Sequence, residues 1–82
     1  MKVFLSRKAA KALEETPSDL RRRLEEKISE LYRTAYPAGC RKLRGAPNAY
    51  RLRVGDYRVL YTILTKDEIL VFKIARREAA YI

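Results

Sequence analysis

Residues 50–54 alternate strictly between apolar and basic side chains. Because successive side chains of a strand point to opposite faces, this segment predicts a strand with one apolar and one basic face. A two-residue turn at 55–56 then leads into a second, longer apolar strand. In that register Arg53 pairs with Arg58, and Arg51 lies on the same face. The sequence therefore predicts a hairpin that carries three arginines on one outward side.

Three guanidinium groups on one side of a hairpin repel one another, because like charges directly opposite each other destabilise a sheet. An anion bound among them relieves that repulsion, and guanidinium groups bind phosphate oxygens through paired hydrogen bonds. The alternative is that these arginines are ordinary outward residues of a half-exposed sheet. We favour the anion site, and we expect Arg76 or Arg77, at the end of the last strand, to join it.

The whole chain predicts one α+β domain spanning residues 1–82, with elements in the order β-α-α-β-β-β. Two helices are expected to pack on one face of an antiparallel sheet, and the last three strands form a meander. Ser6 is the expected cap of the first helix, and Thr16, before Pro17, that of the second. The expected elements are a strand at 2–5, helices at about 7–15 and 17–34, and strands at 50–54, 57–64 and 69–75.

The net charge is +9, from 19 basic and 10 acidic residues, and a field of this sign attracts polyanions such as RNA or DNA. The chain has no histidine, which excludes histidine-based general bases and the usual zinc sites. A single cysteine, Cys40, makes no internal disulfide and fits a reducing cytoplasm. We expect a cytoplasmic protein with no metal or cofactor and no membrane partner, since no apolar run or leader pattern suggests otherwise.

Several tyrosines lie among the basic residues, and aromatic rings beside arginines can stack on bases. Tyr50, Tyr57 and Tyr61 share the apolar phase of their strands, which favours the core as their place. Tyr81 differs, because it follows the last strand in a polar segment. The arginines at 21–23 are expected on the solvated surface of the second helix.

The segments Lys42-Leu43-Arg44-Gly45 and 50–61 resemble the central signature of the RelE/ParE toxin superfamily. The segments at 4–9 and 74–81 resemble its two ends, so the resemblance spans essentially the whole chain. It implies a RelE-like, microbial ribonuclease-like fold and the toxin of a bacterial or archaeal toxin–antitoxin pair. RelE-type members cleave messenger RNA in the ribosomal A site, whereas ParE-type members poison DNA gyrase and lack the basic catalytic set.

The resemblance also implies roles for individual residues. The reaction is attack of a ribose 2′-hydroxyl on the adjacent phosphorus, without a metal or cofactor. Arg58 and Arg77 are expected at the scissile phosphate, and Tyr81 is the candidate base. Arg51 and Arg53 replace residues that are often lysines, and because arginine stays protonated, neither is expected to act as a base. The implied catalytic set is Arg51, Arg53, Arg58, Arg77 and Tyr81, and the implied RNA-binding set is Arg41, Lys42, Arg44 and Arg76.

The partners implied are an acidic, RelB-like antitoxin that folds on binding, together with the ribosome and messenger RNA. The toxin itself is expected to be monomeric and to assemble into heteromers with the antitoxin. Two other functions stay open from the sequence: a gyrase-poisoning toxin of the ParE type, and a nucleic-acid-binding module without chemistry of its own.

Overall fold

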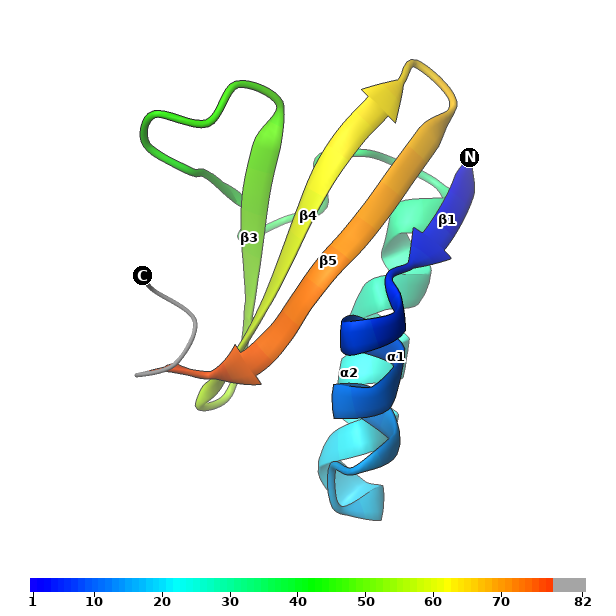
Figure 1. Ribbon diagram of the computed structural model, residues 1–82, viewed down its shortest axis with the longest axis vertical. Helices are drawn as coiled ribbons and strands as arrows, with labels where there is room; N and C mark the ends of the chain where they lie inside the picture. The colour runs from blue at the N-terminus through cyan, green and yellow to red at the C-terminus, as the bar shows by residue number, and fades with distance from the viewer. Residues whose placement is uncertain (78–82) are drawn as a thin grey trace.

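A five-stranded sheet and two helices make up the computed structural model, which describes residues 1–77 (Figure 1). The elements are β1 (Lys2–Leu5), α1 (Arg7–Glu14), α2 (Ser18–Ser29), the 3₁₀ helix η1 (Glu30–Tyr32), β2 (Arg41–Lys42), β3 (Ala49–Val54), β4 (Tyr57–Thr65) and β5 (Glu68–Arg76). The strands lie in the order β1-β5-β4-β3-β2.

The two helices begin in different ways. The Ser6 hydroxyl accepts a hydrogen bond from the Ala9 backbone N–H at 3.1 Å, which confirms the predicted cap of α1. The predicted cap of α2 was wrong: the Thr16 hydroxyl donates to the Ala12 carbonyl in the preceding helix, at 2.8 Å. Pro17 is the residue that precedes α2, and it has no side-chain acceptor. The 3₁₀ turn η1 then carries the helical segment on to Tyr32, two residues short of the predicted end.

The sheet confirms the predicted α+β class and the antiparallel meander of β3, β4 and β5. One edge differs from the expected antiparallel sheet, because β1 pairs with β5 in parallel, with Val3 opposite Ile69. The helical pair returns the chain to the far side of the meander, which leaves β1 beside the last strand. The short strand β2 was expected to be loop, and it adds a pairing of Arg41 with Arg51 at the other edge.

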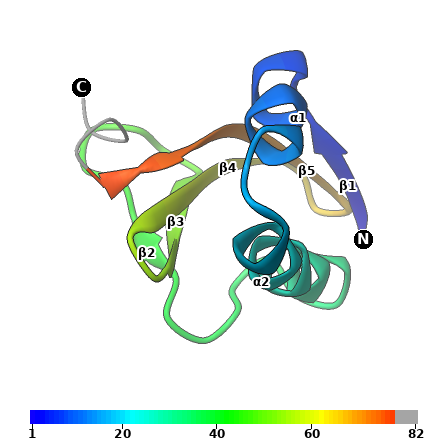
Figure 2. The same cartoon turned by 90° about the horizontal axis from the view of Figure 1, so that it is seen from below.

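The core lies between the helices and one face of the sheet. Figure 2 looks along both helices and shows the sheet curving past them. Tyr61 is completely buried there, and its hydroxyl donates to the Ala35 carbonyl at 2.6 Å. The buried residues of this core are Ala9, Leu24, Ile28, Leu31, Ala35, Leu52, Val54, Val59, Tyr61, Ile69, Val71 and Ile74. Arg51, Arg53, Arg58 and Leu60 alternate with these strand residues and therefore lie on the opposite, open face.

Candidate functional site

The β3–β4 hairpin has the predicted register. Arg53 pairs with Arg58, and Arg51 lies opposite Leu60. Gly55 opens the turn with a φ of +58°, a left-handed value that a first turn residue of such a hairpin often needs and that glycine adopts without strain. The three arginines therefore share the open face of the sheet, as the alternation predicts.

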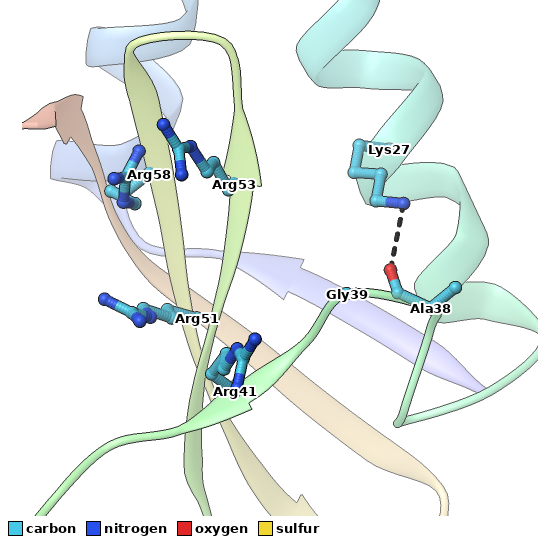
Figure 3. Close-up of a pocket in the computed structure, with 7 residues that line it drawn as sticks. All are labelled: Lys27, Ala38, Gly39, Arg41, Arg51, Arg53 and Arg58. Atoms are coloured by element: carbon cyan, nitrogen blue, oxygen red, sulfur yellow. Dashed lines mark hydrogen bonds between the residues drawn. The ribbon is translucent and has the colours of Figure 1, made fainter.

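These arginines line a cavity of about 390 Å³ at the β3 edge of the sheet (Figure 3). Lys27 reaches it from α2, and its ammonium group donates to the Ala38 carbonyl at 3.2 Å. The same group lies 3.3 Å from a carboxylate oxygen of Glu30. Five of the seven described residues that line the cavity are basic: Lys27, Arg41, Arg51, Arg53 and Arg58. We call this cavity the arginine pocket.

Arg58 lies on the predicted face but is not an outward residue, because only 5% of it is exposed. Its guanidinium group donates to its neighbour's backbone, the Tyr57 carbonyl, at 3.3 Å. Burial lowers the pKa of Arg58, and the positive charges of Arg53 and Arg51 lower it further. A buried cation among other cations is electrostatically unfavourable, and an anion in the pocket would offset that cost.

Arg77 belongs to the same electrostatic neighbourhood. Its backbone N–H donates to the Asp56 carbonyl at 2.6 Å, which fixes the end of β5 beside the hairpin turn. Its charge also contributes to the lowered pKa of Arg58. The structure thus brings together four of the five residues of the implied catalytic set. Tyr81, the fifth, lies outside the described residues.

Lys73 also lies on the open face, and the sequence analysis missed it. Strict alternation from Ile69 and Val71 would turn its side chain toward the core. A bulge shifts the register, so that Leu60 pairs with Lys73 while Tyr61 pairs with Val71. A bulge of this kind re-aims the side chains that follow it. The apolar phase of Ile74 was the available signal, since it requires Lys73 to face the other way.

The implied RNA-binding set does not form one group. Arg41 lines the arginine pocket. Lys42 pairs with Tyr50 and so lies on the helix side of the sheet, and Arg44 is exposed in the following turn. Arg76 pairs with Tyr57, again on the side away from the pocket.

The tyrosines of the hairpin pack as the sequence predicts. Tyr50 and Tyr57 are partly buried against the core, and the ring of Tyr50 stacks on that of Tyr61 with 5.8 Å between centroids. The rings of Tyr36 and Tyr50 meet edge to face, with 5.4 Å between their centroids. These rings support the hairpin from the helix side, opposite the arginine pocket.

Residues 1–77 contain neither a cluster of metal-ligating side chains nor a membrane-spanning helix. In this part of the chain, no three acidic, cysteine or histidine side chains gather where they could hold a metal ion. No helix of these residues has the length and apolarity that crossing a bilayer requires.

Comparisons with known proteins agree with this fold. Residues 3–81 match the family model described as ParE toxin of the type II toxin–antitoxin system parDE. A curated protein of Methanocaldococcus jannaschii that carries the name RelE1 is 32% identical, over 96% of this chain and 92% of that protein.

Solved structures of the same kind superpose on the chain. The crystal structure of the archaeal RelE–RelB complex from Pyrococcus horikoshii contains a chain that is 30% identical, with a TM-score of 0.80 over 95% of this chain and 96% of that one. A chain of the chromosomal ParDE system of P. aeruginosa has a TM-score of 0.72 over 93% and 95%, and at 20% identity it shares the fold alone. The chain therefore belongs to the RelE/ParE superfamily of type II toxin–antitoxin toxins.

Proposed function

We propose that this toxin is a ribosome-dependent endoribonuclease of the RelE type, which cleaves messenger RNA in the A site and so inhibits translation in the cytoplasm. One observation carries the proposal: Arg51, Arg53 and Arg58 line one pocket, together with Arg41 and Lys27. A pocket so rich in cations fits the phosphates of an RNA backbone. The relatives that carry the RelE name support the same choice.

The proposed reaction is attack of a ribose 2′-hydroxyl on the adjacent phosphorus. The oxygen–phosphorus bond that forms gives a 2′,3′-cyclic phosphate, and the bond that breaks releases a 5′-hydroxyl. Negative charge gathers on the phosphate oxygens in the transition state. Arg58 and Arg77 would stabilise that charge, and because the Arg58 guanidinium is already held by the Tyr57 carbonyl, it needs little reorganisation.

Arg51 and Arg53 would hold the phosphate and the flanking backbone. Arg53 is also the candidate acid for the leaving oxygen. An arginine is a poor base because its guanidinium group stays protonated. The proposal therefore assigns proton removal to Tyr81, whose unperturbed pKa of about 10 would need positive surroundings to help at neutral pH. The ribosome would supply the substrate geometry, so the free protein should be a weak nuclease.

A gyrase-poisoning function is the second candidate, because the matching family model is described as a ParE toxin. ParE-type members of the superfamily are expected to lack the basic catalytic set, so the arginine pocket weighs against gyrase poisoning. The two functions differ in target, in product and in dependence on the open face.

Incubation of the purified protein with translating ribosomes separates the two functions. We expect message cut within codons at the A site, mapped by primer extension, and unchanged supercoiling by DNA gyrase. Arg58→Ala should abolish cutting, whereas Arg22→Ala, an exposed arginine of α2, should leave it intact. Intact message together with inhibited supercoiling would overturn the proposal in favour of the second candidate.

Salt dependence gives an independent test of the RNA site. If about six basic groups contact the backbone, log affinity for single-stranded RNA should fall against log salt with a slope near −4, from about −0.7 per contact. A nearly flat dependence would contradict an arginine-lined RNA site.

The proposed partner is a small, acidic, RelB-like antitoxin that folds on binding. The open face offers it two kinds of surface. Exposed apolar residues, Phe4 on β1 and Leu64 on β4, are 46% and 51% accessible, and the arginines lie toward the hairpin turn. An amphipathic helix and an extended segment could cover both. The P. horikoshii structure is a RelE–RelB complex, which supports a partner of this kind.

We favour inhibition by steric exclusion or by displacement of the segment that bears Arg77 and Tyr81, over plugging of the pocket by carboxylates. Within that segment, Tyr81 lies outside the described residues. The structure of the toxin–antitoxin complex tests the choice. Antitoxin carboxylates bonded to Arg58 and Arg77, with the segment in the position it has in the free toxin, would contradict it.

A further inference from the structure

Two further hollows lie beside the arginine pocket along α2. A second hollow, of about 260 Å³, shares Lys27 and Arg53 with the pocket. A third, of about 370 Å³, shares Arg23 and Gly55 with the second. Adjacent hollows share lining residues, so the three lie in a row between α2 and the tip of the β3–β4 hairpin, and we call this row the tip groove.

Arg23 stands at the middle of the tip groove. A methyl group at position 55 would lie 3.7 Å from both terminal nitrogens of Arg23, so its guanidinium group rests over the hairpin turn. Lys27 is four residues further along α2 and therefore on the same side of the helix. The sequence analysis placed Arg23 on the solvated helix surface. Its side chain is exposed, but it is directed at the hairpin.

The charges along the groove are graded. The arginine pocket is strongly cationic, and the far hollow, lined by Arg23 and Arg76, also contains Asp56. In the middle, Glu26 and Glu30 face the groove, and Glu30 is paired with Lys27. A polyanion is therefore held most firmly at the pocket and more loosely beyond it. This pattern suits a strand that is held at one phosphate in the pocket and guided along the groove on one side of it.

We propose that the tip groove binds the phosphodiester backbone of the RNA strand next to the scissile phosphate, with Arg23 and Arg76 as its phosphate contacts. This inference rests on the proposed function, since it extends the same substrate beyond the arginine pocket. Arg23 acts as a binding residue and takes no part in the reaction. The groove is open, so the phosphates in it keep part of their hydration, and each contact is modest.

The test measures binding of two 2′-O-methyl RNA probes, which cannot be cleaved because the attacking hydroxyl is blocked. A dinucleotide carries one phosphodiester and can occupy only the arginine pocket, whereas a longer oligonucleotide also reaches the groove. Arg23→Ala should weaken the longer probe about fivefold, make its salt slope shallower by about 0.7, and leave the dinucleotide unchanged. Arg22→Ala is the matched control, since it removes the same charge from the same helix, and it should change neither probe by more than about twofold.

Glu26→Gln supplies a test of opposite sign. It removes a negative charge from the groove, so it should strengthen binding of the longer probe about two- to threefold. If Arg23→Ala and Arg22→Ala bind the longer probe with equal affinity, the proposed role of the groove is wrong. A loss of poly-glutamate binding in Arg23→Ala without a loss of RNA binding would also overturn it, because the groove would then serve an acidic protein.

Failure of the groove is distinguishable from failure of the proposed function. Arg58→Ala should abolish dinucleotide binding if the pocket holds the scissile phosphate, whatever Arg23→Ala does. If Arg58→Ala binds the dinucleotide as tightly as the wild type does, both the proposed function and the proposed role of the groove are wrong.

Discussion

The two faces of the sheet bury residues to a similar degree and for different reasons. Val59 and Arg58 are neighbours on β4, with exposed fractions of 0% and 5%, and they point in opposite directions. Helices cover Val59, whereas Arg58 lies on the open face among other long basic side chains. Low exposure on one face therefore reports a hydrophobic core under helices, and on the other face it reports cover by long basic side chains. The two kinds of burial are distinguished by the side chains that cover the residue, which are apolar on one face and basic on the other.

The largest expected difference between the faces is in activity. Arg58→Met keeps the bulk of the side chain and removes its charge. If the proposed function holds, the rate of message cleavage on ribosomes should fall about 10²- to 10³-fold, as when one preorganised donor to a transition state is lost. Arg33→Met, at an exposed arginine on the helix side, is the control and should cleave normally. Similar rates for the two variants would show that Arg58 does not contact the reacting phosphate.

A leucine-to-alanine substitution on each face compares how tightly the two faces of the sheet are packed. Leu52 is fully buried in the helix-covered core, and Leu60 is 5% exposed on the open face. Leu52→Ala should cost about 3–4 kcal/mol of unfolding free energy, because a closed core leaves a cavity. Leu60→Ala should cost about 1–2 kcal/mol, since the flexible stems around it can collapse into the space. Urea unfolding measures both, and equal losses would mean that the open face is packed as rigidly as the core.

Arg58 should contribute little net stability to the fold. Its lowered pKa reflects burial of a charge and repulsion from neighbouring cations, while its hydrogen bond to the Tyr57 carbonyl acts in the opposite direction. Arg58→Met should therefore change the free energy of unfolding by less than about 1 kcal/mol, and the melting temperature by less than about 5 °C. Calorimetry of Arg58→Met and Arg33→Met makes the comparison. A melting temperature more than about 5 °C lower in Arg58→Met than in the control would assign Arg58 a structural role.

The core face has its own titratable group, Tyr61. Burial is the first cause that raises the pKa of Tyr61 well above its usual value of 10. The folded state therefore keeps the phenol neutral while the unfolded state ionises, so stability is full below pH 10 and declines above it, by up to about 1.4 kcal/mol per pH unit.

Tyr61→Phe isolates that contribution. It removes the hydrogen bond to Ala35 and should cost about 1 kcal/mol near pH 8. Urea unfolding between about pH 8 and pH 11 should show the gap between wild type and variant closing as pH rises. The other ionisable groups cancel, because both proteins contain them. A constant gap would show that Tyr61 ionises equally in both states.

The hairpin was predictable because two local signals agree on it. The alternation fixes which side chains share a face, and Gly55 with Asp56 fixes the register in which Arg53 meets Arg58. The two helices were likewise expected close to where α1 and α2 lie, at about 7–15 and 17–34. These features depend on neighbours in sequence, which a single chain displays directly.

The missed features depend on partners distant in sequence. Arg41 and Lys42 pair as a strand only because β3 lies beside them, and no apolar pattern marks two basic residues as a strand. The bulge that turns Lys73 to the open face is set by the pairing of β5 with β4. Arg23 looks like any solvated arginine until the hairpin turn is placed against α2. Each case required the tertiary structure.

The parallel pairing of β1 with β5 determines when the sheet can be completed during synthesis of the chain. A ribosome delivers the start of a chain first, so β1 emerges early and has no strand to pair with until Ile69 and its neighbours are made. At roughly 5–20 residues per second, that wait lasts on the order of several seconds. Contacts so far apart in sequence also make folding slow. The open face, with Lys73 and Arg77 in place, is therefore complete only after residue 77 has been made. Until then, a growing chain does not have all the cations of that face in their final positions.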